Sequence, residues 1–148
     1  MNEDRIHENI VEIERHLRKI DYIIRKKGRE IITEENITAP QFQALQILIN
    51  NEEMTIGELS QKMALACSTI TDLIDRMEKA ELVLRRKSRK DKRVVIVEVL
   101  PRGHEILEKV LKKRRAYLRG KMADYQLEEM ELLRGQLATL YEAIKNED

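Results

Sequence analysis

Hydrophobic residues in the first thirty positions of the chain recur at intervals of four and three. Between about residues 3 and 32 the intervals are four, three, four, three and four, which is the 3.5-residue period of a coiled-coil seam. The residues on this stripe are Ile6, Ile10, Ile13, Leu17, Ile20 and Ile24. The pattern predicts a long helix that packs against other helices, because an amphipathic helix of this length needs a partner for its apolar side.

Two further long helices are predicted over residues 101–123 and 126–145. The first carries the apolar residues Ile106, Leu107, Val110, Leu111, Leu118 and Met122. The second carries Leu127, Met130, Leu133, Leu137, Leu140 and Ile144. The three stripes offer more apolar surface than the intervening segment needs for its own core, so we expect a homodimer. The predicted dimer interface consists of Ile6, Ile10, Ile13, Leu17, Leu133, Leu137, Leu140 and Ile144.

Two short helices in the middle of the chain have clear start signals. Thr38 and Gln41 have the spacing of a capping box, which predicts that a helix begins there. Thr55 and Glu58 repeat that spacing and predict a second helix up to about residue 65. Only a short link separates this helix from the next one, and the pair is therefore expected to form a helix-turn-helix.

The helix predicted over residues 68–80 has one apolar and one polar face. Its apolar residues follow i, i+3, i+4, i+7 spacing and are expected to be buried: Ile70, Leu73, Ile74 and Met77. At 3.6 residues per turn, a set of polar residues then points away from the core. These are Ser68, Asp72, Asp75, Arg76 and Lys79, with Thr69 and Thr71 on the flanks.

A strongly basic segment, residues 84–93, follows this helix and leads into a β-branched strand over residues 94–99. It contains Arg85, Arg86, Lys87, Arg89, Lys90, Lys92 and Arg93, with Asp91 as its one acid. Such a run is either a solvated charged ribbon or a phosphate-binding surface. Crowded cations repel one another and gain nothing locally, which favours binding to DNA phosphates or the minor groove. A polar-faced helix beside a cationic hairpin suits a major groove and its flanking backbone.

Charge is distributed unevenly along the 148 residues, which suit a single domain. The formal net charge is only +1. However, residues 109–121 are basic without any acid, and residues 124–148 are acidic. The 109–121 run is a second candidate DNA surface, but its interleaved apolar residues favour solvated or flanking-phosphate cations on a helix. Aromatic residues make up only 3% of the chain, too few for a surface that stacks single-stranded nucleic acid.

Several other classes of protein are disfavoured by the sequence. No apolar run approaches the ~18 residues needed to span a membrane, and the polar N-terminus does not resemble a signal peptide. We therefore expect a soluble, cytoplasmic protein without a membrane partner. The sequence has no glycine-rich phosphate loop and no arrangement of a nucleophile with a base. We expect neither an enzyme nor a cofactor.

The residues with metal-binding or redox chemistry are isolated in the sequence. His7, His16 and His104 lack the spacing of a metal site, so no bound metal is expected. Cys67 is the only cysteine, which excludes an intramolecular disulfide. Its place at the start of the polar-faced helix leaves two alternatives, a thiol activated by the helix dipole or a small semi-buried filler.

In order and spacing, these elements resemble the MarR family of bacterial winged-helix regulators over nearly the whole length. The motifs that carry this resemblance are Ser68-Thr69-Ile70-Thr71, Leu82-Val83, Asp91-Lys92-Arg93 and Gly103. The resemblance implies a mainly α fold with a small β-hairpin wing, in which a winged helix-turn-helix is flanked by long N- and C-terminal dimerisation helices. Within a single domain of residues 1–148, it implies a DNA-binding lobe at 36–100 and a dimerisation lobe at 1–35 with 101–148.

The sequence departs from the family pattern at three positions. Leu100 replaces the usual capping threonine of the helix after the wing, a loss of ~1 kcal/mol. Glu81 replaces the usual glycine after the recognition helix, where a left-handed backbone would be strained. Asp72 is an acid where many relatives have a neutral or basic residue.

The resemblance also assigns candidate contacts to double-stranded DNA with a pseudo-palindromic operator. The recognition-helix candidates are Ser68, Thr69, Thr71, Asp72 and Arg76. The wing candidates are Arg86, Arg89, Lys90, Asp91, Lys92 and Arg93, of which Asp91 and Arg93 would partly brace the wing. Asp72 and Asp75 are open to two interpretations. They could accept from cytosine amino groups, or pair at i, i+4 with Arg76 and Lys79.

The function that these expectations favour is that of a homodimeric, sequence-specific transcriptional repressor. The alternative is a winged-helix scaffold that binds proteins and no specific DNA. Relatives often respond to small aromatic effectors, and Tyr22, Phe42 and Tyr117 could line such a pocket, although scattered aromatic residues are more often part of a core.

Overall fold

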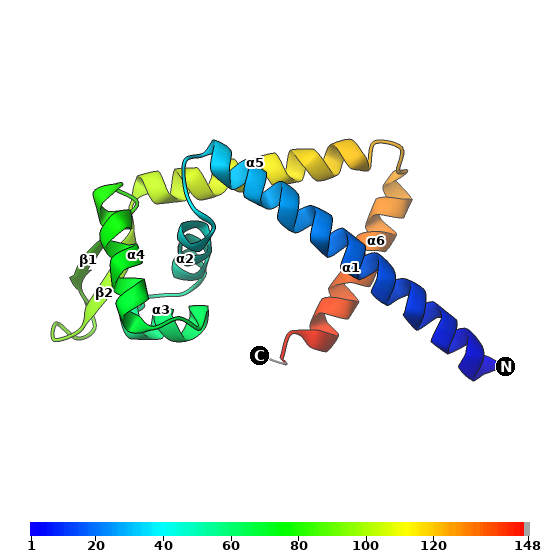
Figure 1. The fold of residues 1–148 in the computed structure, drawn as a ribbon, viewed down its shortest axis with the longest axis horizontal. Helices are drawn as coiled ribbons and strands as arrows, with labels where there is room; N and C mark the ends of the chain where they lie inside the picture. Colours follow the sequence, from blue (N-terminus) through cyan, green and yellow to red (C-terminus); the bar gives the residue numbers. More distant parts are fainter. Residues whose placement is uncertain (147–148) are drawn as a thin grey trace. The chain divides into compact units, whose positions relative to one another are not determined.

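The computed structural model describes residues 1–146, which form six helices and one two-stranded antiparallel sheet (Figure 1). This confirms the expected mainly helical fold with a β-hairpin. The chain divides into two compact units, Met1–Arg114 and a second unit that begins at Arg115. No helix within the described residues is long and apolar enough to cross a membrane.

Helix α1 (Asn2–Glu34) is the long N-terminal helix, and it enters the core only at its C-terminal end. Ile31 and Ile32 are buried there, whereas the apolar stripe earlier in the helix stays in contact with solvent. Ile6, Ile10, Ile13 and Leu17 are 43–59% exposed. Isolated helices gain little stability in water, and most helical stability comes from packing of the apolar face. Within the first unit, the described residues therefore do not supply the partner that the pattern of this stripe requires.

The helical core of the first unit is built from α2 (Ala39–Asn50), α3 (Ile56–Met63) and α4 (Cys67–Lys79). Thr38 and Gln41 form the predicted capping box at the start of α2. Thr55 caps α3 by accepting from the Glu58 N–H at 3.1 Å, but its second bond goes from its hydroxyl to the Glu58 carboxylate. The second predicted capping box is therefore only half formed.

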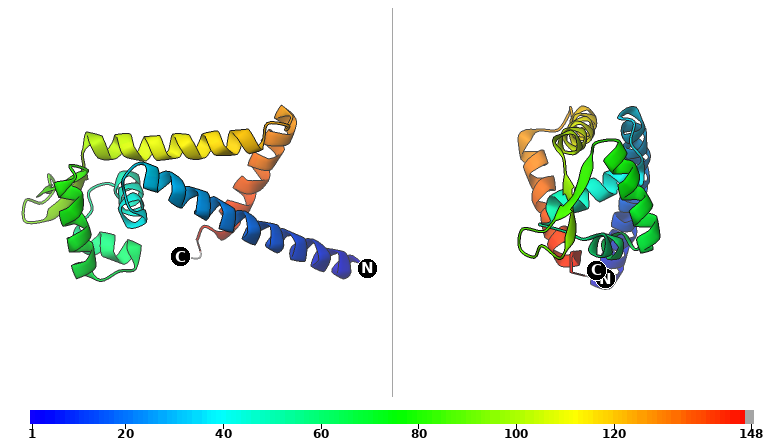
Figure 2. Two further views of the ribbon diagram at one scale, coloured as in Figure 1. Left: turned by 45° about the horizontal axis from the view of Figure 1, so that its top comes forward. Right: turned by 90° about the vertical axis from the view of Figure 1, so that its left-hand side faces the viewer.

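The hairpin consists of β1 (Val83–Lys87) and β2 (Val95–Val99), with Val83 opposite Val99 and Lys87 opposite Val95. Met54 adds a single bridge to β2, where its carbonyl accepts from the Val97 N–H at 2.9 Å. Helix α5 (Pro101–Lys121) follows directly. In Figures 1 and 2 the hairpin lies beside α4, and its loop extends away from the core.

The second unit contains the end of α5 and helix α6 (Leu127–Ile144). At the start of α6 the Gln126 backbone N–H donates to the Glu129 carboxylate at 3.0 Å. No residue of α6 is buried, and Leu137, Leu140 and Ile144 are 38–51% exposed. The apolar face of α6, like the stripe of α1, is therefore largely exposed to solvent.

Candidate nucleic-acid interface

The outward face of α4 is polar and open to solvent, as its pattern predicts. Ser68, Thr69, Asp72 and Arg76 are exposed, and Thr71 is half-buried. The opposite face holds the helix in place, since Ile70, Ile74 and Met77 are fully buried and Leu73 packs partly against the same core. A helix fixed by its apolar face presents its polar side chains at a defined angle, which is what base-edge contacts in a major groove need.

Helix α4 ends in a Schellman motif that turns the chain into the hairpin. The Leu82 N–H donates to the Met77 carbonyl and the Glu81 N–H donates to the Glu78 carbonyl, both at 2.9 Å. Glu81 occupies the left-handed position of this motif with φ of 61°. The structure thus confirms the strained conformation expected where the family uses glycine.

Arg85 of β1 links the hairpin to α4. Its guanidinium donates to the Asp75 carboxylate at 2.7 Å and lies 3.0 Å from that of Glu78. The Glu78 carboxylate also accepts from the Arg85 backbone N–H at 2.8 Å. Of the two interpretations left open for Asp75, the structure does not show the pairing with Lys79, because the strand brings Arg85 against the carboxylate. Within residues 1–146, Asp72 and Arg76 do not form an ion pair either.

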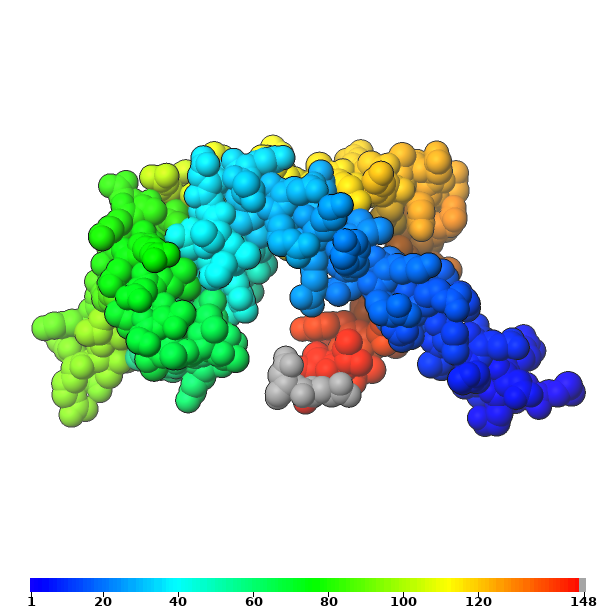
Figure 3. Space-filling model, viewed as in Figure 1, coloured from blue at the N-terminus to red at the C-terminus, as the bar shows by residue number. Residues whose placement is uncertain are grey.

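The loop of the hairpin, residues 88–94, is organised by polar contacts. We call it the wing loop; it projects from the rest of the first unit in Figure 3. Asp91 accepts from the Arg93 backbone N–H and from its guanidinium, all at 3.1 Å. This bidentate pair is the brace suggested by the resemblance, and the Arg93 guanidinium holds the pKa of Asp91 below its ordinary value. The Arg93 side chain stays 90% exposed.

The basic residues of the hairpin are not equally available to a ligand. Lys90 donates to the Glu52 carboxylate at 3.1 Å, and this bond raises the pKa of Lys90. Arg86 lies 3.3 Å from Glu53 and 3.3 Å from Glu98, and its side chain is only 25% exposed. The Arg86 Nε is buried and not oriented for a hydrogen bond to Glu98. Arg86 is thus already engaged within the chain.

Arg89 and Lys92 differ from these paired cations. Both are exposed, and within the part of the chain that the structure describes neither takes part in an ion pair. Arg89, Lys92 and the largely exposed Arg93 can each reach a phosphate without giving up a buried partner. The sequence predicted a basic wing, but it could not tell the engaged residues from the available ones.

The predicted ligand-pocket residues are not brought together in the first unit. Phe42 is 6% exposed in the core, whereas Tyr22 is 65% exposed on α1. Tyr117 belongs to the second unit, where the Lys121 ammonium lies 5.8 Å from the centre of its ring. Cys67 is exposed rather than semi-buried, with its sulfur 3.3 Å from the Ser60 hydroxyl. No cluster of potential metal ligands occurs among the described residues.

Two residues that organise this surface were missed in the sequence. Glu53 contacts the wing loop from the segment between α2 and α3, and the Ser88 hydroxyl donates to its carboxylate. This hydrogen bond from Ser88 is the main cause that holds the pKa of Glu53 below its ordinary value. Ser88 lies 35 positions along the chain from Glu53, so no local pattern could have paired them.

Comparison with known proteins agrees with this architecture. The model of the MarR family matches residues 37–95. The HTH-type transcriptional regulator YsmB of Bacillus subtilis is 49% identical over 138 residues, which cover 93% of this chain and 94% of that protein. A second relative, the organic hydroperoxide resistance transcriptional regulator of Bacillus subtilis, is 30% identical over 58% of each chain. Both relatives are regulators of transcription and not enzymes.

Solved structures of similar proteins extend the match to the fold. A MarR family protein from Bacillus stearothermophilus is 41% identical with a TM-score of 0.84, covering 95% of this chain and 98% of that one. A transcriptional regulator from Thermotoga maritima is 27% identical with a TM-score of 0.76, covering 91% and 95%. The hairpin is therefore a wing and α4 the second helix of a helix-turn-helix. The chain belongs to the MarR family of winged-helix transcriptional regulators.

Proposed function

We propose that the protein is a homodimeric repressor that binds a specific sequence in double-stranded DNA. In this proposal α4 enters the major groove, and the wing loop contacts phosphates or the minor groove. The DNA-binding lobe comprises residues 36–100, and residues 1–35 with 101–148 form the dimerisation lobe. The observation that carries the proposal is the exposed polar face of α4 beside a projecting loop whose Arg89 and Lys92 have no internal ion pair.

The base-reading candidates are the exposed side chains at the start of α4. The hydroxyls of Ser68 and Thr69 can bond to base edges or phosphates, and the threonine methyl suits a thymine methyl. Arg76 suits a phosphate. Asp72 is exposed without an internal cation, which leaves it free to accept from a cytosine amino group.

The uncovered apolar stripes support a dimer. A row of isoleucines and leucines on α1, and another on α6, remain between 38% and 59% exposed in the single chain. Exposed apolar surface of this extent marks an interface in soluble proteins. A two-fold dimer would present two copies of α4 to half-sites about one helical turn apart. A dimer seated over a promoter would exclude RNA polymerase, which is the basis for proposing repression.

The scaffold alternative loses part of its support in the structure. Acidic residues near α4 would favour a protein partner over DNA, but the carboxylate of one of them, Asp75, is already paired with Arg85. We do not propose an effector pocket built from Tyr22, Phe42 and Tyr117, because Phe42 is buried as part of the hydrophobic core.

The test is selection of genomic DNA fragments by the purified protein, followed by binding of the recovered sequence at several salt concentrations. The variant pair Arg89→Ala with Lys92→Ala removes two cations from the wing loop. The matched control, Lys109→Ala with Lys112→Ala, removes two exposed cations from α5, the second candidate DNA surface. Both double variants change the net charge equally.

We expect an inverted repeat to be recovered. The slope of log affinity against log salt should fall by about four in the wing variant, one for each phosphate that the two wings of a dimer no longer neutralise. The α5 control should keep most of the slope. Recovery of unselected fragments by a folded dimer would contradict sequence-specific binding, and a larger loss in the control would move the DNA surface to α5. A promoter–reporter assay with the recovered site decides repression.

A further inference from the structure

One carboxylate gathers the contacts that shape the wing loop. Glu53 accepts from the Ser88 hydroxyl, from the Arg89 backbone N–H at 3.2 Å and from the Arg86 guanidinium at 3.3 Å. Its side chain is only 20% exposed. Three donors from the hairpin thus converge on a residue that belongs to neither strand.

Ser88 connects the Glu53 carboxylate to the backbone of the wing loop. Its side chain is buried, and its oxygen accepts from the backbone N–H groups of Lys90 at 3.1 Å and Asp91 at 3.3 Å. A hydroxyl has one proton to donate and two lone pairs to accept with, so these two bonds leave its proton for Glu53. The three bonds use the whole hydrogen-bonding capacity of Ser88. They close the turn that carries Arg89 and Lys92.

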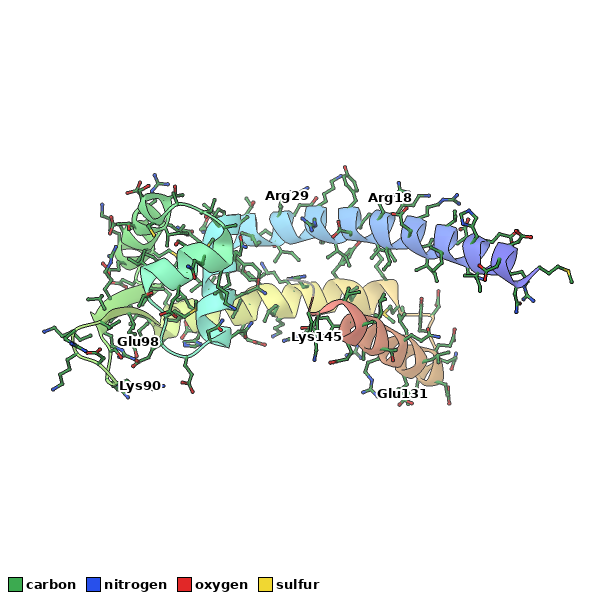
Figure 4. All side chains as sticks on the ribbon, turned by 90° about the horizontal axis from the view of Figure 1, so that it is seen from below. Arg18, Arg29, Lys90, Glu98, Glu131 and Lys145 are labelled. Carbon is green, nitrogen blue, oxygen red and sulfur yellow. The ribbon has the colours of Figure 1, made fainter. Side chains whose placement is uncertain are left out.

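The segment that bears Glu53 is itself fixed to the helical core. Met54 is 4% exposed and bridges to β2 through its carbonyl, and Thr55 caps α3 directly afterwards. Figure 4 shows Lys90 on the wing loop and Glu98 on β2 of the same hairpin. Among the described residues, the neighbouring Glu52 pairs with Lys90 alone, and the side chains of Lys90 and Glu52 are 76% and 88% exposed. Glu52 and Glu53 are adjacent acids with very different surroundings.

We propose that Glu53 is the positioning residue of the wing: through Ser88 and the Arg89 N–H it sets the conformation of residues 88–93. Glu53 does not touch DNA in this scheme. It ties the loop to the body of the helix-turn-helix, so that Arg89 and Lys92 are presented at a defined place relative to α4. The consequence for DNA affinity rests on the proposed function, whereas the effect on the loop does not.

Order in the wing loop is measured first, without DNA, by limited trypsin digestion, since the loop is rich in lysine and arginine. Cleavage of a transiently opened segment tracks the population of its open form. We expect Glu53→Ala to accelerate cleavage within residues 85–93 roughly tenfold or more, while cleavage elsewhere and the thermal midpoint change little. Ser88→Ala breaks the same link from the loop side and should have a similar effect. Glu52→Gln is the matched control and should digest like the parent.

Glu53→Gln removes the charge and part of the hydrogen bonding. Ser88 and the Arg89 N–H bond to different oxygens of the carboxylate, so the single amide oxygen can accept from only one of them, and the amide carries no charge opposite Arg86. We expect cleavage between that of the parent and that of Glu53→Ala. Unchanged wing cleavage in both Glu53→Ala and Ser88→Ala would overturn the proposal. Equal acceleration at every site with a lowered thermal midpoint would also overturn it, because it would assign Glu53 to general stability.

The same variants are then compared on the selected DNA. Glu53→Ala should bind more weakly, with a salt slope reduced by about 0.9 for each phosphate that the displaced loop no longer reaches, whereas Glu52→Gln should keep or increase its affinity. A parental slope in Glu53→Ala would overturn the link between wing position and DNA contact. If the parent protein selects no DNA but the digestion result holds, the proposed function fails and the positioning role of Glu53 stands.

Discussion

Helix α4 and the wing loop are neighbouring parts of the proposed DNA surface, but different forces hold them. Helix α4 is fixed by Ile70, Ile74 and Met77, which are fully buried. The wing loop has no such apolar anchor between residues 88 and 93; it depends on the contacts of Ser88 with Glu53 and of Asp91 with Arg93. One element is placed by burial of apolar surface, and the other by a small number of charged and polar groups.

This difference has consequences for how each element responds to change. Burial of apolar area depends little on pH or salt, whereas the contacts of a carboxylate are weakened by acid, and exposed ion pairs are also weakened by salt. The position of α4 should therefore persist wherever the protein is folded. The wing loop should be adjustable by single charges while the fold stays intact, so contacts to bases and contacts to phosphates can be disturbed separately.

The largest effect is expected from a change beneath α4. Ile74→Ala removes a fully buried side chain from the core and should lower the free energy of unfolding by about 2–5 kcal/mol. Chemical denaturation measures this loss. Val95→Ala on β2, where the side chain is 50% exposed, is the control and should stay within ~0.5 kcal/mol of the parent. Equal losses at the two positions would mean that α4 and the hairpin do not differ in their support.

The next largest loss of stability is expected at Gly103, which lies against the residues Leu82 and Val99 at the open end of the hairpin. A Cβ on Gly103 would lie 2.6 Å from the Leu82 carbonyl oxygen and 2.7 Å from a Val99 methyl carbon. Gly103→Ala should therefore destabilise the protein by roughly 1–3 kcal/mol, the usual result of overpacking. Gly28→Ala in α1 meets nothing within 4 Å and should instead stabilise by up to about 1 kcal/mol through helix propensity. Thermal unfolding of both variants distinguishes crowding from propensity.

A smaller effect of opposite sign is expected where α4 turns into β1. Glu81 has φ of 61°, so Glu81→Gly should relieve backbone strain and raise stability by about 1 kcal/mol. Glu81→Gln keeps the strain while removing the charge, and it should leave stability nearly unchanged. If the glutamine variant gains as much as the glycine variant, the cost at this position is electrostatic rather than conformational.

Most of the fold could be predicted because local patterns carry it. The apolar period gave α1, α4 and α6 nearly to their ends, and capping residues such as Thr38 marked where helices begin. The left-handed position of Glu81 followed from its place after α4 in the family pattern. Each of these features depends on residues within a few positions of one another.

The candidate site could be predicted only in outline, because its decisive contacts join distant segments. Arg85 lies 10 residues from Asp75, and Glu53 lies 35 from Ser88. A count of basic residues therefore could not show that Lys90 and Arg86 are engaged while Arg89 and Lys92 are not. The same limit explains why the only ion pair that the sequence offered for Asp75 lay along its own helix, where i, i+4 spacing is visible, and not with a strand.

The smallest effect concerns pH and should appear only in the wing loop. The Ser88 hydroxyl lowers the pKa of Glu53, and the Arg93 guanidinium lowers that of Asp91, from ordinary values of 4.5 and 3.8. A carboxyl whose folded pKa is depressed contributes stability above its ordinary pKa and loses it as pH falls through the folded value. Order in the loop should thus be constant from neutral pH to about 5 and decline only below about 4.

Backbone amide NMR signals of Arg89 and Arg93 should shift in that acid range, while those of Ile70 and Ile74 in α4 stay in place. Glu53→Gln should lose the part of the shift that Glu53 contributes at Arg89 and keep the part at Arg93. Simultaneous movement of all four signals would mean that the wing loop and α4 unfold as one unit, which would remove the contrast between them.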